Sequence, residues 1–120
     1  MTDRLLDITT GTAVCDLDHL AVESGAAALV DGEAVAVFRV EGDAVFALAN
    51  YDPFSGASVL ARGIVGSRGE VPTVASPMHK QVFDLRTGQC LDDAAVRVAT
   101  YEAAVVEGRI VVGRRREPDA

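Results

Sequence analysis

Two short segments of the sequence hold the side chains best suited to chemistry. The first is Asp52-Pro53-Phe54, followed by Ser55-Gly56, and the second is Ser76-Pro77-Met78-His79, followed by Lys80. Each segment contains a proline and follows an apolar run that favours a strand. Carboxylate, hydroxyl and imidazole groups can bind a metal ion or move a proton. The two segments are therefore the places in this chain where chemistry could occur.

None of these side chains completes a catalytic or metal site by itself. His79 could be a metal ligand or a general base, but a zinc site needs further protein ligands and a base needs a partner and a pocket. We interpret His79 as a polar loop residue and Asp52 as the organiser of the turn before Pro53. Ser76 lacks the Gly-x-Ser-x-Gly elbow of a serine nucleophile. We therefore assign no catalytic, cofactor-binding or metal-binding residue to this chain.

The composition is typical of one small globular domain. The chain has 120 residues, of which 49% are hydrophobic, and its formal net charge is −7. This charge disfavours nucleic-acid binding, which needs cations to displace counterions. No apolar run is long enough to span a membrane and no secretory signal is visible, so we expect a cytoplasmic protein. The basic cluster Arg114-Arg115-Arg116 is expected to lie in a solvated tail, with electrostatic contact to a partner as the alternative.

The two cysteines do not indicate a metal site. Cys15 and Cys90 lie far apart in the sequence and no Cys-x-x-Cys motif is present. In the cytosol they are expected to be reduced, buried thiols. Whether they pair stays open, because a disulfide needs Cα atoms within about 7 Å of one another.

Turn residues and apolar runs predict a mostly β chain. One short helix is expected at residues 16–22, with Asp16 as its N-cap. Three apolar runs joined by tight turns at Asp31-Gly32 and Glu41-Gly42-Asp43 predict a meander of strands: 27–30, 34–40 and 44–49. The middle strand is apolar on both faces, so we expect it to be covered on both sides.

Regular patterning stops over residues 50–70, where Gly63, Gly66 and Gly69 punctuate the chain. A loop of this length in a compact domain is usually functional. Strands are expected to resume in four further segments: 71–75, 81–85, 96–106 and 109–113. The whole chain is then expected to hold eight or nine short strands.

The second segment resembles the second cluster loop of Rieske domains. That pattern reads Cys-Pro-x-His-Gly-x-x-Phe-Asp-Leu-x-Thr-Gly, and residues 76–88 of this chain follow it from Pro77 onward with few departures. The first segment resembles the Cys-Pro-His loop of the same family. Rieske domains hold a two-iron cluster with two cysteines on one iron and two histidines on the other.

On this resemblance, three of the four cluster ligands are missing. Asp52 and Ser76 stand at the cysteine positions, Phe54 and His79 stand at the histidine positions, and Lys80 stands where the pattern has glycine. The resemblance implies an all-β, Rieske-like antiparallel β-sandwich with a smaller loop-bearing subdomain. We expect one such domain over residues 1–113, without a cluster, and a basic and acidic C-terminal tail over 114–120.

A narrower resemblance accounts for the missing ligands. Four blocks are similar to the small subunit of assimilatory NAD(P)H-dependent nitrite reductases, and the likeness covers about residues 12–113: 50–56, 59–66, 74–85 and 87–93. In that family a large subunit carries FAD, an iron–sulfur cluster and siroheme and reduces nitrite to ammonium. The resemblance implies that this chain is its small, non-catalytic, cluster-free partner in the cytoplasm. Nucleic acid and membrane are not expected partners.

Two other functions stay open. A Rieske-type ferredoxin would pass electrons through a cluster, although the ligand count argues against it. A stand-alone interaction domain, or a small enzyme that uses Asp52 and His79, would act without a large subunit.

The two segments also raise a question about Phe54. Phe54, Met78 and Val82 could form an apolar tip that docks on the large subunit. Alternatively, Phe54 fills the space that a cluster would occupy. The candidate partner-facing residues at the former ligand positions are Asp52, Phe54, Ser76, His79 and Lys80.

Overall fold

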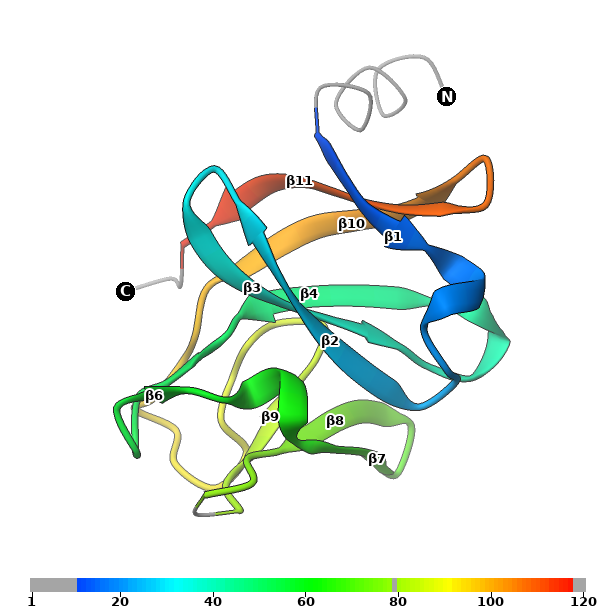
Figure 1. Cartoon of the computed structure of the whole chain (residues 1–120). Helices are drawn as coiled ribbons and strands as arrows, with labels where there is room; N and C mark the ends of the chain where they lie inside the picture. The colour runs from blue at the N-terminus through cyan, green and yellow to red at the C-terminus, as the bar shows by residue number, and fades with distance from the viewer. Residues whose placement is uncertain (1–10, 79, 118–120) are drawn as a thin grey trace.

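The computed structural model describes residues 11–78 and 80–117 of the chain. Within these residues the backbone forms eleven strands and three short 3₁₀ helices (Figure 1). The strands are β1 Thr12–Asp16, β2 Ser24–Val30, β3 Glu33–Arg39, β4 Val45–Ala49, β5 Tyr51–Asp52, β6 Ala57–Ser58, β7 Ile64–Arg68, β8 Val71–Ala75, β9 Val82–Asp84, β10 Thr100–Val106 and β11 Arg109–Arg116. The 3₁₀ helices are η1 Leu17–His19, η2 Glu41–Asp43 and η3 Leu60–Arg62. The strand pairs are antiparallel, so the predicted all-β antiparallel class is confirmed.

The strands form one large sheet and two small ones. Six strands pair in the order β1-β11-β10-β4-β3-β2, three pair as β7-β8-β9, and β5 pairs with β6. In Figure 1 the small sheets lie together at the lower end of the molecule, beneath the large sheet. This arrangement confirms the sandwich with a smaller loop-bearing subdomain that the Rieske resemblance implied.

The predicted meander is the β2-β3-β4 part of the large sheet. Asp31 and Gly32 both have positive φ angles, 52° and 81°, as a tight hairpin turn requires. β3 is buried on both faces, as its sequence predicted. Val35 and Val37 belong to one apolar cluster, whereas Ala36 and Phe38 belong to another.

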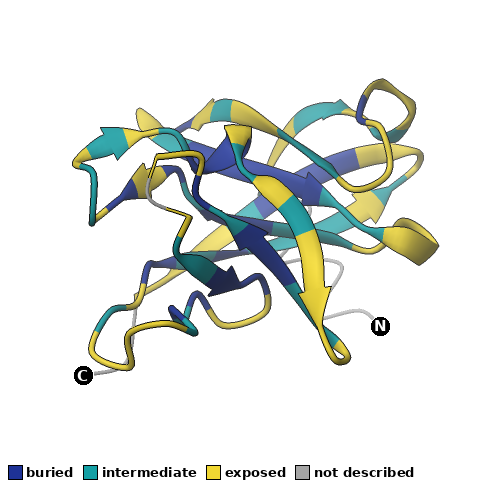
Figure 2. Cartoon of the chain, turned by 90° about the horizontal axis from the view of Figure 1, so that it is seen from below, coloured by how far each residue is buried: buried dark blue, intermediate teal, exposed yellow. Residues whose placement is uncertain are grey.

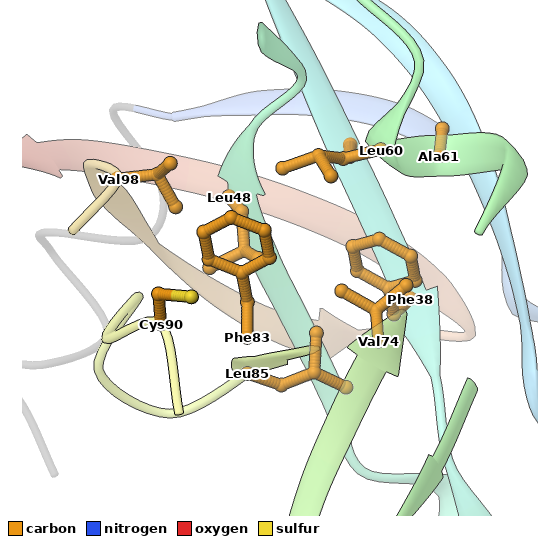
Figure 3. Packing of buried hydrophobic residues seen from close by; sticks show 10 residues of the cluster. Phe38, Leu48, Leu60, Ala61, Val74, Phe83, Leu85, Cys90 and Val98 are labelled. Atoms are coloured by element: carbon orange, nitrogen blue, oxygen red, sulfur yellow. The ribbon is translucent and has the colours of Figure 1, made fainter. Parts of the chain in front are cut away.

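These two clusters form the core on the two sides of the large sheet. One lies between the large sheet and the loop-bearing subdomain, where side chains from both parts interdigitate (Figure 3): Phe38, Leu48, Leu60, Val74, Phe83, Leu85, Cys90 and Val98. The other fills the opposite face of β3 and includes Ile110 and Val112 of β11. Figure 2 shows buried residues along the central strands and exposed residues at the turns. The subdomain that carries the loops is thus anchored to the large sheet by apolar packing.

The predicted helix at 16–22 is wrong. Residues 17–19 form a single 3₁₀ turn, and the Asp16 side chain makes no capping hydrogen bond. The segment turns a corner after β1, where the Leu17 amide donates to the Gly108 carbonyl and Leu20 is buried. A helix this short cannot offset its nucleation cost, and these tertiary contacts fix the turn instead.

The predicted irregular segment at 50–70 is also wrong, because it contains β5, β6, η3 and β7. β7 pairs with β8 from Ile64↔Ala75 to Arg68↔Val71. The alternation that marks a strand is obscured here, because Ile64 is 74% exposed and Gly66 interrupts the apolar pattern.

The C-terminal hairpin differs from its predicted bounds at both ends. β10 begins at Thr100 rather than at 96, and β11 continues to Arg116 rather than ending at 113. Arg114 to Arg116 are therefore strand residues. The side chain of Arg115 forms an ion pair with Glu33, and that of Arg116 forms one with Glu102. Residues 118–120 of the expected tail lie outside the described residues.

The two cysteines are not paired with each other. Cys15 and Cys90 are both free thiols, but Cys15 is only partly buried, which differs from the expectation.

Within the described residues, 11–78 and 80–117, the structure has no helix with the length and hydropathy that a bilayer crossing requires.

Candidate functional site

The candidate site consists of two loops, 52–56 and 76–80, that leave the ends of short strands in the loop-bearing subdomain. Asp52 is the last residue of β5, and Ser76 directly follows β8. Apolar residues next to both loops, including Leu60, Val74 and Phe83, pack into the cluster under the large sheet. The packing of these neighbours anchors the chain next to each loop.

The structure brings Asp52 and Ser76 together. The Ser76 hydroxyl donates a hydrogen bond of 2.5 Å to Oδ2 of Asp52. Asp52 is 0% exposed and Ser76 is 1% exposed, so this bond is shielded from water. The two positions where the Rieske pattern has cysteine are thus joined directly by protein atoms.

Each of these side chains also caps its own loop. Oδ1 of Asp52 accepts from the Phe54 amide at 2.9 Å, and Oγ of Ser76 accepts from the Met78 amide at 3.2 Å. A backbone bond then closes each loop, from the Gly56 amide to the Asp52 carbonyl and from the Lys80 amide to the Ser76 carbonyl. Asp52 is therefore a turn organiser, as the sequence predicted.

Hydrogen bonds decide the ionisation of the buried carboxylate. Burial by itself raises the pKa of the Asp52 carboxyl group. The Ser76 hydroxyl, the Phe54 amide and the hydroxyl and amide of Ser55 outweigh burial, and the pKa lies below its ordinary value. Asp52 is therefore ionised at neutral pH and accepts hydrogen bonds at both oxygens.

Phe54 lies on the apolar cluster rather than apart from it. Its side chain is partly buried and packs against that cluster. Its ring centre is 6.2 Å from that of Phe83, with 53° between the ring planes, which is a favourable aromatic contact.

Lys80 and Met78 are the other described residues of loop 76–80 that the sequence singled out. Lys80 is exposed and has a φ angle of 63°, which places a lysine in the left-handed region where the Rieske pattern has glycine. Met78 is 55% exposed. His79 lies outside the described residues.

The side chains that are present do not fit a Rieske cluster. The cluster needs two thiolates and two imidazoles, whereas the cysteine positions hold a carboxylate and a hydroxyl. Those oxygens are already bonded to each other, and Phe54 offers no donor atom. Elsewhere in the described residues there is no group of three or more His, Cys, Asp or Glu side chains that could hold a metal ion.

A groove on the described surface lies away from the loops, and no sequence pattern pointed to it. β4 and β10 pair only at Thr100↔Leu48 and Tyr101↔Ala47, and between them is a groove of about 790 Å³. Arg86 and Arg116 line it but bond to Asp84 and Glu102. Because these charges are compensated within the chain, the loops remain the better candidate site.

Comparisons with known proteins agree with this architecture. A family model described as a Rieske-like [2Fe-2S] domain matches residues 11–113. The nitrite reductase (NADH) small subunit of Escherichia coli K12 is 43% identical over 96 residues, which is 79% of this chain and 89% of that protein. A crystal structure assigned as an NADH-dependent nitrite reductase small subunit of Mycobacterium tuberculosis superposes with a TM-score of 0.83 at 50% identity, covering 86% of this chain and 93% of that chain.

A longer relative contains the same domain within a larger polypeptide. The nitrite reductase [NAD(P)H] large subunit of Klebsiella oxytoca is 38% identical over 104 residues, which is 87% of this chain but 11% of that protein. With the fold, the two loops and the residues at the four ligand positions, these matches establish that the chain belongs to the Rieske-like domain family, among the small subunits of NAD(P)H-dependent nitrite reductase.

Proposed function

We propose that this chain is the small, non-catalytic subunit of a cytoplasmic assimilatory nitrite reductase that uses NADH or NADPH. In this proposal a large subunit with FAD, siroheme and an iron–sulfur cluster reduces nitrite to ammonium. The observation that carries the cluster-free part of the proposal is the buried hydrogen bond between Asp52 and Ser76, at the two positions where the Rieske pattern has cysteine. The nitrite reductase part rests on the similar small subunits.

The chemistry of the loops supports a subunit that holds no cofactor of its own. Iron in a Rieske cluster is bound by soft thiolates and by imidazoles, and the carboxylate and hydroxyl found here are hard oxygen donors. The same argument disfavours the Rieske ferredoxin, because an electron carrier needs the cluster. A stand-alone enzyme is disfavoured because Asp52 is buried and engaged at both oxygens.

Association with a large subunit is supported by the relative from Klebsiella oxytoca, in which a similar domain is part of the large subunit itself. Two domains that share one polypeptide in one organism are well placed to associate as separate chains in another. We propose that loops 52–56 and 76–80 face this partner, with Asp52, Phe54, Ser76, His79 and Lys80 as the residues that define them. We also retain one Rieske-like domain over residues 1–113 as part of the proposal.

We assign Phe54 to the filling of the former cluster space rather than to docking. Its ring contacts Phe83 and the apolar cluster, as a plug would. Docking contacts would then come from exposed side chains such as Met78 and Lys80.

The test combines the purified chain with the large subunit of the same organism. We expect a complex of defined stoichiometry by size-exclusion chromatography with light scattering, and nitrite reduction only when the large subunit is present. A chain that neither associates with the large subunit nor changes its activity or stability would refute the proposal, as would turnover of nitrite by the small chain alone.

A further inference from the structure

The two loops of the candidate site repeat one hydrogen-bonding scheme. In each, a polar residue precedes proline and its side-chain oxygen accepts the amide two residues later: Phe54 to Asp52, and Met78 to Ser76. In each, the carbonyl of that residue accepts the amide four residues later. Gly56 and Lys80, which supply those amides, both have left-handed φ angles, 74° and 63°.

One bond joins the two copies of this scheme. The Ser76 hydroxyl donates to Asp52, so a continuous chain of hydrogen bonds runs from the Phe54 amide through Asp52 and Ser76 to the Met78 amide. A Rieske cluster would bridge the same two loops, since its ligands come as one cysteine and one histidine from each. Here the bridge is made of protein atoms.

We propose that Asp52 and Ser76 are positioning residues whose direct bond replaces the cluster as the cross-link between loops 52–56 and 76–80. Beside it, the Phe54 ring contacts Phe83 of β9, so the bond adds a polar link between the loops to an apolar one. The bond thereby fixes how the two loops lie relative to each other. The consequence for a large subunit rests on the proposed function, whereas the cross-link itself is a property of the isolated chain.

The energetics favour a cross-link over a simple pair of turn caps. A buried carboxylate costs free energy unless hydrogen bonds compensate it, and a neutral cap would avoid that cost. The described residues place no ion pair on Asp52, so its stabilisation comes from the hydroxyl and amide donors of the two loops. A charge-assisted hydrogen bond is also stronger than a neutral one, which suits a bond that must hold two loops together.

The test exchanges the two residues, because the repeated scheme lets either loop carry either side chain. Asp52→Ser leaves two hydroxyls at the bridge, and Ser76→Asp leaves two carboxylates that repel each other. The double variant Asp52→Ser/Ser76→Asp restores one carboxylate and one hydroxyl in exchanged positions. The readout is the hydrogen-exchange rate of the Phe54 and Met78 amides in the isolated chain.

We expect each single variant to raise these exchange rates by about tenfold or more, with Ser76→Asp the more severe. The exchanged double variant is expected to return to within about threefold of the wild type. Asp93→Ser is the matched control, because Asp93 caps its own turn at Ala95 and bonds through its side chain to no other loop among the described residues.

The proposal would be overturned if the losses of amide protection in the two single variants added up in the double variant. Additivity would mean that each side chain only caps its own loop. Unchanged exchange in both single variants would overturn it as well. If Ser76→Asp alone fails to fold, Ser76→Ala supplies the single-variant loss of the bond with which the exchanged double variant is compared. In a parallel titration with the large subunit, the variants with faster amide exchange should also bind the large subunit more weakly. If the single variants bind as tightly as the wild type, the cross-link has no role in docking, and the proposed subunit function still stands.

Discussion

At the residue scale, a carboxylate and a hydroxyl stand where Rieske domains have thiolates, and this exchange changes what the two loops can hold. Thiolates bind iron, whereas the Asp52 carboxylate accepts hydrogen bonds from the Ser76 hydroxyl and from the Phe54 amide. The two cysteine positions were identifiable from the sequence because each precedes a proline in a recognisable pattern. The bond between them was not, because it joins residues 24 positions apart whose contact depends on how two loops are placed.

Ionisation of Asp52 is expected to make stability depend on pH in the acid range. Its pKa in the folded chain lies below the ordinary value, so protonation favours the unfolded state. The stabilisation is fully present above the unfolded pKa of about 3.9 and is lost as pH falls through the lower folded value.

Urea denaturation of the wild type and of Asp52→Asn across this range provides the measurement. The difference in their free energies of unfolding should be constant between about pH 5 and pH 7 and should shrink below about pH 4. A difference that stays constant throughout would show that the ionised form of Asp52 is not the stabilising one.

Phe54→Ala separates packing from docking. If Phe54 fills the former cluster space, its removal leaves a cavity beside Phe83 and lowers the free energy of unfolding by about 2 kcal/mol, less than for a fully buried phenylalanine. Affinity for the large subunit should change little when measured below the unfolding temperature.

Tyr51→Ala is the control, because Tyr51 is the neighbouring aromatic residue and is 52% exposed. It should change stability by no more than about 0.5 kcal/mol. Unchanged stability of Phe54→Ala together with weakened binding would identify Phe54 as a docking residue.

At the element scale, the strands that hold the loops were only partly predictable. β3 and β8 were recognised because their residues are apolar and buried. β7 was missed because its pairing with β8 leaves most of its side chains exposed, so its sequence carries little apolar alternation. The segment 16–22 was wrongly predicted as a helix, because its helix-like composition is overridden by the tertiary contacts of a single turn.

Gly63, at the entry to β7, is expected to be indispensable for the placement of loop 76–80. A Cβ at this position would lie 2.3 Å from the Ala75 carbonyl oxygen, one residue before Ser76. Because backbone cannot move away cheaply, Gly63→Ala should lower the free energy of unfolding by about 2 kcal/mol or more.

Gly66→Ala provides a matched control in the same strand. Its Cβ would meet nothing closer than Oγ1 of Thr73 at 3.8 Å, so stability should change by no more than about 0.5 kcal/mol. Equal effects of the two substitutions in chemical denaturation would contradict the close contact between the start of β7 and the end of β8.

At the scale of the whole molecule, the chain keeps the architecture of a cluster-binding domain while its loops are joined by side chains. The sandwich and its loop-bearing subdomain could be predicted from the Rieske resemblance, and the matching family model spans residues 11–113. The end of β11 could not, because Arg114 to Arg116 look like a solvated tail until Glu33 and Glu102 are found opposite them. The groove between β4 and β10 also arises from how two strands diverge, which no local pattern encodes.

The central claim is that protein atoms have replaced the cluster, and iron analysis of the purified chain tests it most directly. The chain would be produced without oxygen, with iron and sulfide supplied, and then assayed for iron, acid-labile sulfide and visible absorbance. We expect a colourless protein with no stoichiometric iron or sulfide, and loops that are ordered without them. Two irons and two sulfides per chain, with the spectrum of a Rieske centre, would contradict the account.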